Sequence, residues 1–306
     1  MAFFLIVPRA AQPVLHQIFT IIAPVLAMAA IGFAWVRLRM PFDNNTITDI
    51  ILNVGSPCLL FSTLLTRRPE PGALAEIAVV GLSMLACVGI VAAIGLKLAR
   101  MDLRTYWPAL VFPNSGNMGL PLCLLAFGET GLSLAIAFFC AMTIVQFTVG
   151  QGVASGHMHP MILLRNPILW SIAVALTLLF ADVTPPEWIM NTTDTLGHMV
   201  IPLMLMSLGT SLARLRIVTF TRSLVLSLLR LGLGFGVALG LVTAFGLEGP
   251  VRGVVLIQSS MPTAVFSYLF ALRYGGKHEE VGAMVVLSTL AAFILLPVLM
   301  GFVLHG

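Results

Sequence analysis

The run PNSGNMGLP, at Pro113–Pro121, interrupts a long apolar stretch that extends from about Tyr106 to Phe127. Proline lacks a backbone donor and clashes with the preceding helical turn. Asparagine amides and unpaired backbone groups each cost several kcal/mol in hydrocarbon. An unbroken helix that faces lipid is therefore excluded. Such an interruption is tolerated in a membrane only where it is buried in protein or lines a polar cavity.

The interrupted stretch is one of ten apolar segments that are long enough, at about 20 residues each, to cross a bilayer. The chain has 306 residues, of which 59% are hydrophobic and only 9% are charged, and its mean hydropathy is +1.04. These values predict an all-α membrane protein that contacts the lipid bilayer, with short loops. The ten predicted spans are 14–36, 47–66, 74–99, 106–127, 131–153, 166–182, 188–212, 219–245, 251–272 and 280–303.

Basic residues predict how the chain is oriented in the membrane. With the N-terminus outside, eleven basic residues fall in inner loops and four in outer segments, so both termini are expected outside. The net charge of +4 then reflects topology, and no nucleic-acid partner is predicted. The inner set is Arg37, Arg39, Lys97, Arg100, Arg104, Arg165, Arg214, Arg216, Arg222, Arg273 and Lys277, and the outer set is Arg9, Arg67, Arg68 and Arg252.

An internal repeat appears when the sequence is shifted by 145 residues, from the difference 202 − 57 between two mid-span prolines. Pro57 then meets Pro202, and the Thr-Asp pair at 48–49 meets the pair at 193–194. Each copy has five predicted spans, so the second copy must enter the membrane from the opposite side. This predicts an inverted repeat, with the copies at 1–153 and 166–306 and a cytoplasmic connector at 154–165.

The repeat partner of the interrupted span is itself interrupted. Pro262 falls where Asn117 falls in the first copy, and Ser259, Ser260 and Thr263 place hydroxyl groups around it. Two interrupted spans at corresponding places are typical of secondary transporters, and we expect them to cross near the bilayer midplane. Helix N-termini at such a crossing present free N–H groups and partial positive charge, which suit a small anion, especially a carboxylate.

Five motifs together cover nearly the whole chain, namely ILNVGSPCLLFSTL, PNSGNMGLPL, RNPILW, IPLMLMSLGTSL and MPTAVFSYLFALRYGG. In these motifs the chain resembles the auxin efflux carrier family, in its bacterial branch. The resemblance implies a transporter with a scaffold domain (spans 1, 2, 6 and 7), through which it would form a homodimer, and a transport domain (spans 3–5 and 8–10). It also implies an elevator-type motion in the bacterial inner membrane and small organic-acid substrates such as auxin, malonate or malate.

The predicted binding residues come from both interruptions. By the resemblance, Asn114 and Asn117 lie at the first crossing, and Pro121 and Pro262 mark the two breaks. The mid-span prolines are expected to bend the scaffold helices that face the site. The full predicted set is Asn114, Ser115, Gly116, Asn117, Gly119, Pro121, Ser259, Ser260, Pro262 and Thr263, with Pro57, Pro202, Arg230 and Gln258 as further possibilities.

Arg230 lies inside the eighth predicted span and has two interpretations. An arginine at mid-bilayer costs about 3 kcal/mol on insertion scales, so it is either a substrate counter-ion or gate, or it extends its head to the inner surface. It lies about eight residues into its apolar run, and helical side chains lean toward the helix N-terminus. We therefore favour the second interpretation, in which the guanidinium reaches water.

Glycines at 232, 236 and 240 in the same span share one helix face. This spacing predicts a surface for close helix packing. A nucleotide-binding loop is excluded because no strand precedes these glycines.

Other classes of protein are disfavoured by what the sequence lacks. No paired nucleophile and base and no metal-binding motif is visible, so we predict neither an enzyme nor a metal or cofactor site. The four cysteines lie in apolar spans, at spacings unlike those of metal ligands. A membrane channel or a sensor for small solutes is the alternative function. The coupling ion stays open, because no carboxylate lies near the centre of a span.

Overall fold

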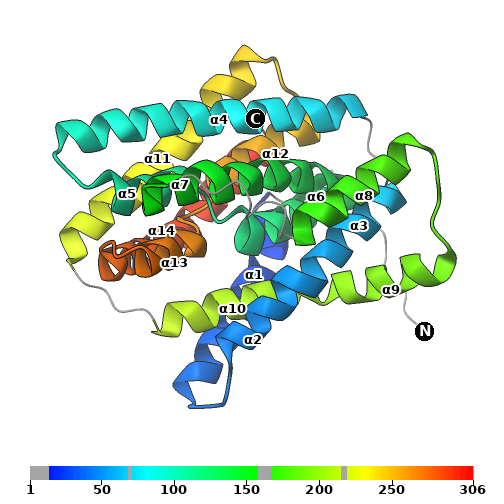
Figure 1. Ribbon diagram of the computed structural model, residues 1–306, viewed down its shortest axis with the longest axis horizontal. Helices are drawn as coiled ribbons and strands as arrows, with labels where there is room; N and C mark the ends of the chain where they lie inside the picture. The colour runs from blue at the N-terminus through cyan, green and yellow to red at the C-terminus, as the bar shows by residue number, and fades with distance from the viewer. Residues whose placement is uncertain (1–13, 68–70, 158–166, 215–218, 306) are drawn as a thin grey trace.

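The computed structural model describes residues 14–67, 71–157, 167–214 and 219–305 (Figure 1). Over these residues all regular secondary structure is helical, apart from one isolated β-bridge. Each of the ten apolar segments predicted from the sequence lies on one or more helices. Most of the predicted connector at 154–165, and the basic residues at 9, 68, 165 and 216, lie outside the described residues.

The first half of the chain contains α1 (Val14–Arg37), α2 (Asn44–Ile50), the π-helix η2 (Ile51–Gly55), α3 (Ser56–Arg67), α4 (Pro71–Leu98), α5 (Leu103–Val111), η3 (Ser115–Gly119), α6 (Leu120–Val145), η4 (Gln146–Gly150) and α7 (Gln151–Ser155). The second half contains α8 (Pro167–Phe180), α9 (Glu187–His198), α10 (Val200–Arg214), α11 (Phe220–Ala244), α12 (Gly249–Ser259), α13 (Val265–Arg273) and α14 (His278–His305). Helix α6 changes direction at Gly128, whose φ of 65° is left-handed.

Six described helical stretches are long and apolar enough to cross a membrane. On several of them apolar side chains cover the exposed face as well as the buried one. On α4, for example, Ile90 and Leu98 are exposed while Met84 and Val88 are fully buried. A helix that is apolar all round, yet lies at the surface, requires an apolar solvent. The protein is therefore a multi-pass membrane protein.

The two mid-span prolines each follow a discontinuity in their helix. Pro57 follows η2, where the hydrogen bonding changes from α to π, and Pro202 follows the break at Met199 between α9 and α10. Proline explains these breaks because it cannot donate to the carbonyl one turn earlier. The two discontinuous segments pack against one another. A Cβ built on Gly197 would lie only 2.8 Å from the Cα of Leu59.

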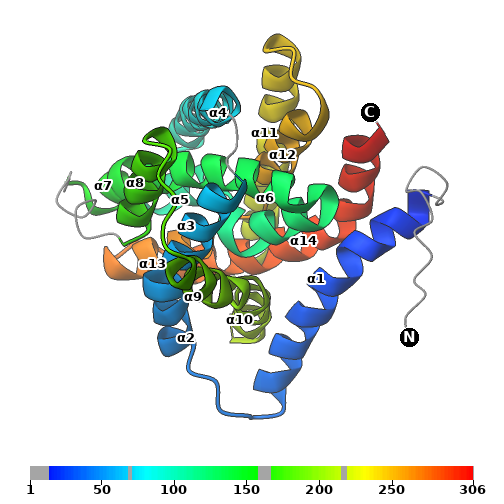
Figure 2. The same ribbon diagram turned by 90° about the vertical axis from the view of Figure 1, so that its right-hand side faces the viewer.

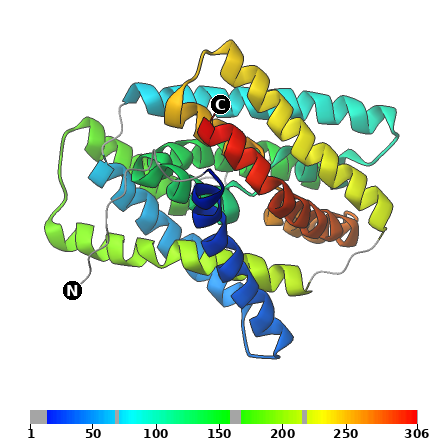
Figure 3. The same cartoon turned by 180° about the vertical axis from the view of Figure 1, so that it is seen from behind.

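The helices contact one another in two groups. In the first, α1 packs along α10, while α3 packs on α8 and α9. In the second, α4 packs on α5 and α6, α11 on α14, and α12 on α6. Figures 2 and 3 show α1 and α10 crossing on one side of the molecule, with α4 and α11 on the other. The contact between α1 and α10 is a backbone contact, since a Cβ on Gly209 would lie 1.8 Å from the carbonyl oxygen of Ala29.

The predicted packing face on α11 is wrong. Gly232, Gly236 and Gly240 are exposed, and a Cβ on any of them would meet nothing within 4 Å. The glycine that packs closely is Gly234, which is buried against α12. The periodicity identified a face of small residues, but the neighbouring helix meets the opposite face.

Candidate functional site

The first interruption follows directly from its prolines. Helix α5 ends at Val111, and Phe112 is extended, with φ −91° and ψ 115°. A residue before proline is disfavoured in helical conformation, which explains why the helix stops ahead of Pro113. Helical structure resumes in η3 at Ser115 and continues into α6, where Pro121 occupies a first-turn position that needs no N–H donor.

The second interruption has the same cause. Helix α12 ends at Ser259, and α13 begins at Val265, so Ser260–Ala264 are not helical. Pro262 lies in the middle of this gap. The hydroxyl of Ser260 donates to the carbonyl of Leu256 at 2.6 Å, which closes the last turn of α12. Both interruptions predicted from the sequence are therefore present.

The two interruptions cross and bind to one another through their backbones. Pro113 and Thr263 form an antiparallel bridge. The N–H of Asn114 donates to the carbonyl of Pro262 at 2.7 Å, and the N–H of Ala264 donates to the carbonyl of Phe112 at 3.0 Å. We call Phe112–Asn114 together with Ser260–Ala264 the crossover. It joins α5 and α6 to α12 and α13, between α4 and α10 (Figure 1).

Hydroxyl groups hold the crossover in place. Thr263 donates from its hydroxyl to the carbonyl of Ala109 at 3.1 Å, and its N–H donates to the hydroxyl of Ser288 at 3.1 Å. Ser267 donates to the carbonyl of Pro108 at 3.0 Å. The hydroxyls of Ser260 and Thr263, which are among the predicted substrate ligands, thus each donate a hydrogen bond to a backbone carbonyl.

Several amide and hydroxyl groups beside the crossover have no hydrogen-bond partner although they are buried. They are Nδ2 of Asn114, both side-chain polar atoms of Gln258, Nε2 of Gln146 and the hydroxyl of Ser259. Buried polar groups in native proteins are nearly always paired, so a cluster of unpaired ones indicates a site for a ligand or water. Gln146 was not predicted, although a glutamine inside the apolar segment 131–153 was a signal for it.

Three further predicted residues, Gly116, Asn117 and Gly119, belong to η3 itself. Gly116 and Asn117 are partly exposed, and the ring of Phe139 lies 3.1 Å from where a Cβ of Gly116 would be. Gly119 lies against the amide of Gln258, which a Cβ would meet at 2.2 Å. Helix α10, which carries Pro202, contacts η3 directly, while Pro57 is half-buried where α3 begins.

Our interpretation of Arg230 as a surface-reaching side chain is wrong. Arg230 has no exposed surface, and its Nη2 donates to the carbonyl of Ser259 at 3.1 Å. The guanidinium therefore lies at the C-terminal end of α12, next to the crossover. The sequence placed it inside an apolar helix, but could not show that α12 ends in front of it.

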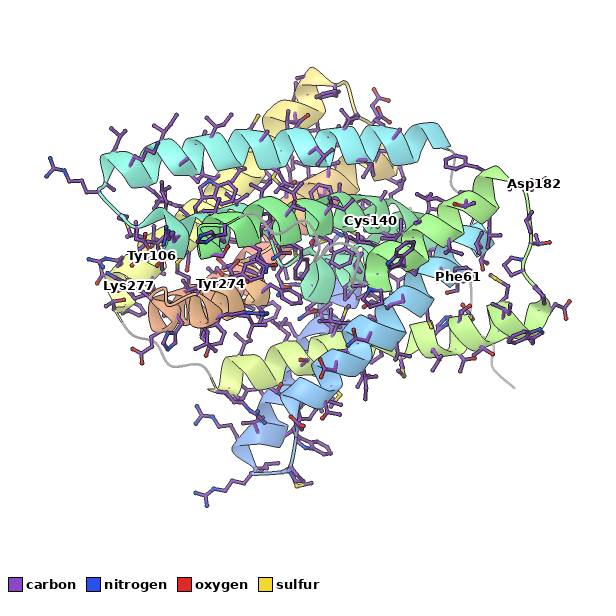
Figure 4. All side chains as sticks on the ribbon, viewed as in Figure 1. Phe61, Tyr106, Cys140, Asp182, Tyr274 and Lys277 are labelled. Carbon is purple, nitrogen blue, oxygen red and sulfur yellow. The ribbon has the colours of Figure 1, made fainter. Side chains whose placement is uncertain are left out.

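An ionic cluster that the sequence did not predict lies at one end of the molecule. Glu280, in the first turn of α14, accepts a short hydrogen bond from the hydroxyl of Tyr106 and one from Arg222 at 3.4 Å. Lys277 lies 3.7 Å from the same carboxylate. Figure 4 shows Tyr106, Lys277 and Tyr274 together at this end, and Asp182 at the opposite end.

Two further features bear on ligands. A cavity of about 520 Å³ lies at the other end of α12 from the crossover, lined by Phe127, Leu247, Glu248, Gly249, Pro250, Arg252, Val303 and Leu304. Within the described residues, no three His, Cys, Asp or Glu side chains are arranged to hold a metal ion.

Apolar surface helices around a polar crossover are the structure of a membrane transport protein. Residues 17–154 and 151–300 match the family described as membrane transport protein, so the chain belongs to this family, the auxin efflux carrier family.

Two archaeal proteins are similar to the chain. An uncharacterized transporter of Methanothermobacter thermautotrophicus is 25% identical over 270 residues, which cover 83% of this chain and 87% of that protein. An uncharacterized transporter of Methanocaldococcus jannaschii is 28% identical over 176 residues, which cover 53% of this chain and 56% of that protein. The expected relationship to transporters is confirmed.

Proposed function

We propose that this protein is a secondary transporter of small organic anions, such as auxin-like carboxylates, malonate or malate. The observation that carries the proposal is the crossover, where η3 and α13 begin beside an unpaired amide of Asn114. The N-termini of these helices direct hydrogen-bond donors and partial positive charge toward the crossover. A carboxylate would satisfy the amide and the free N–H groups together.

The charges around the crossover favour an anion over a cation. Among the buried residues in the described part of the chain, Arg230 is the only charged one, and no buried aspartate or glutamate accompanies it. A site for a metal cation or an organic cation would use carboxylates. The unpaired groups are mainly donors, namely amide nitrogens of Asn114, Gln146 and Gln258. Apart from Oε1 of Gln258 and the hydroxyl of Ser259, these groups can only donate, which fits a ligand that brings oxygen atoms.

The packing supports the architecture that we propose for transport. The ten spans form two inverted five-helix repeats, at 1–153 and 166–306. Spans 1, 2, 6 and 7, which are α1, α2–α3, α8 and α9–α10, form the scaffold. The other spans, from α4 to α7 and from α11 to α14, form the transport domain. Helix contacts are densest within each of these groups, and the groups meet where α10 reaches η3, where α1 meets α6 and α14, and where α3 meets α6. In this proposal the transport domain moves past the scaffold in an elevator-type motion.

The substrate binds between α10 and the crossover in this proposal. Asn114, Ser115, Gly116, Asn117 and Gly119 contact it directly. Pro121 and Pro262 set the helix breaks, and Thr263 and Ser260 hold the crossover, while Gln258 and Ser259 supply groups that are now unpaired. Pro57 and Pro202 shape the scaffold helices that face the site.

We further propose that the protein is a homodimer, joined through the scaffold, in a bacterial inner membrane with both termini outside. The ends of the molecule support this orientation. Lys277, a predicted inner residue, and Asp182, the last residue of the sixth predicted span at its outer side, lie at opposite ends (Figure 4).

Uptake into proteoliposomes tests the function. Radiolabelled malonate, malate and indole-acetate are offered to wild type and to Asn117→Ala, with Asn191→Ala, an exposed residue of α9, as the matched control. We expect saturable uptake and exchange by wild type and by the control, and at least a tenfold loss of transport efficiency in Asn117→Ala. Unsaturable flux without exchange would indicate a channel instead. Unchanged affinity and rate in Asn117→Ala would refute the site.

A further inference from the structure

Arg230 occupies an unusual place, because its charge lies at the end of a broken helix and not at a surface. Its Nη2 donates to the carbonyl of Ser259, the last residue of α12. The C-terminal end of a helix carries partial negative charge and unpaired carbonyl groups. In transporters with broken helices, such carbonyl ends coordinate the cation that is coupled to transport.

The helix that carries Arg230 is shaped to hold it there. Gly234 lies one turn further along α11, and a Cβ on it would meet the Ser259 carbonyl oxygen at 2.1 Å and Nη1 of Arg230 at 2.8 Å. Any side chain at 234 would therefore separate the guanidinium from α12. Gly236, on the same helix, faces open space, so the requirement for glycine is specific to position 234.

The charge of Arg230 is not balanced by an acid. Its Nε and Nη1 have no hydrogen-bond partner, and within the described residues it forms no ion pair with a carboxylate. An uncompensated buried charge is strongly destabilising, so such a group is retained where it serves a function. The helix end supplies only part of the missing negative charge. A bound anion at the crossover would supply the rest.

We propose that Arg230 is a built-in counter-cation that takes the place of a coupling cation at the end of α12. This inference rests on the proposed function. The transport domain then carries its own positive charge, and no inorganic cation is needed to bind or move the anion. A transport domain loaded with a monocarboxylate has no net charge at this site, while the empty domain carries one positive charge. Arg230 acts through the end of α12 and is a positioning residue.

Voltage makes this charge measurable. One elementary charge that crosses a potential of 100 mV changes an equilibrium by roughly 50-fold. The experiment uses full-length protein in proteoliposomes, with a potassium diffusion potential and exchange of radiolabelled indole-acetate or malonate. We expect exchange by wild type to be the same in sodium, potassium and choline media. Indole-acetate exchange is expected to change less than twofold between 0 and 100 mV.

Variants of Arg230 and Gly234 separate charge from structure. In Arg230→Gln, the charge that moves with the substrate-loaded transport domain should become about one unit more negative. Indole-acetate exchange should therefore become voltage-dependent and at least tenfold slower. Arg230→Lys should keep the voltage response of wild type. Gly234→Ala should slow exchange without changing its voltage response, and Gly236→Ala should match wild type.

The outcomes distinguish this inference from the proposed function. Sodium-dependent exchange by wild type, or an Arg230→Gln protein with the rate and voltage response of wild type, would overturn the inference and leave the transporter proposal intact. Failure of wild type to move any of the acids would overturn both. A variant that does not fold is recognised by its elution on size-exclusion chromatography. The voltage response of wild type then decides the question, because indole-acetate exchange that depends strongly on voltage would overturn the inference.

Discussion

At the scale of single residues, the crossover separates polar groups that hold the structure from polar groups that are available. Thr263 uses both its hydroxyl and its N–H inside the protein. Asn114 uses its backbone to bind Pro262, while Nδ2 of its side chain stays unpaired at 5% exposure. Residues of similar polarity in the same short segments therefore have different tasks, which hydrogen-bond accounting reveals.

Thr263→Val is expected to destabilise the crossover. Valine keeps the shape of threonine but removes the donor to Ala109 and leaves that carbonyl unpaired, which costs about 1–3 kcal/mol. The measurement is the midpoint of thermal unfolding in detergent. Thr263→Ser keeps the hydroxyl and serves as the control, with a smaller loss expected. Equal stability of Thr263→Val and wild type would contradict the structural role.

At the scale of helices, glycines set which elements touch. Helices α1 and α10 approach so closely that Gly32 and Gly209 each face a backbone carbonyl of the other helix. Because the neighbouring atoms are backbone, they cannot turn away as a flexible side chain would. The contact fixes α10, and with it the face that α10 presents to η3.

Gly209→Ala is expected to push α1 and α10 apart. Its added methyl group would lie 1.8 Å from the carbonyl oxygen of Ala29, and overpacking of this kind typically costs about 1–3 kcal/mol. Thermal unfolding in detergent measures the effect. Gly240→Ala adds the same group at a helical site with open space, so it should be neutral or slightly stabilising. A Gly209→Ala protein as stable as the Gly240→Ala protein would show that the helices do not meet as described.

At the scale of the whole molecule, the helices separate two ends. One end carries the cluster around Glu280, where α5, α11 and α14 are joined by Tyr106 and Arg222. The other end carries the loop with Asp182 (Figure 4). The imbalance of basic residues predicts that the first end faces the cytoplasm.

Cysteine labelling tests that orientation. Lys277→Cys should react with a membrane-impermeant maleimide only after the cells are opened, whereas Asp182→Cys should react in intact cells. Wild type measures labelling of the native cysteines, including the exposed Cys87 of α4, which we expect to face lipid. Labelling in the opposite order would mean that the chain is inserted the other way round.

The amino-acid sequence alone predicts the membrane class, the helical segments and the two interruptions. These properties are local, because hydropathy and the missing N–H of proline act wherever the residue stands. Pro113 and Pro262 break their helices for this reason. The family was also visible in the sequence, since its motifs surround the same breaks.

The side chains that meet at the breaks depend on how the helices pack, which the local sequence does not show. Arg230 and Ser259 are 29 residues apart, and their contact exists because α11 packs on α12 with Gly234 between them. For the same reason the sequence assigned the packing face of α11 to the wrong glycines and did not show the hydrogen bonds that Thr263 makes within the protein. A helical period shows which residues share a face, but the contacts of that face depend on a neighbour that the local sequence does not contain.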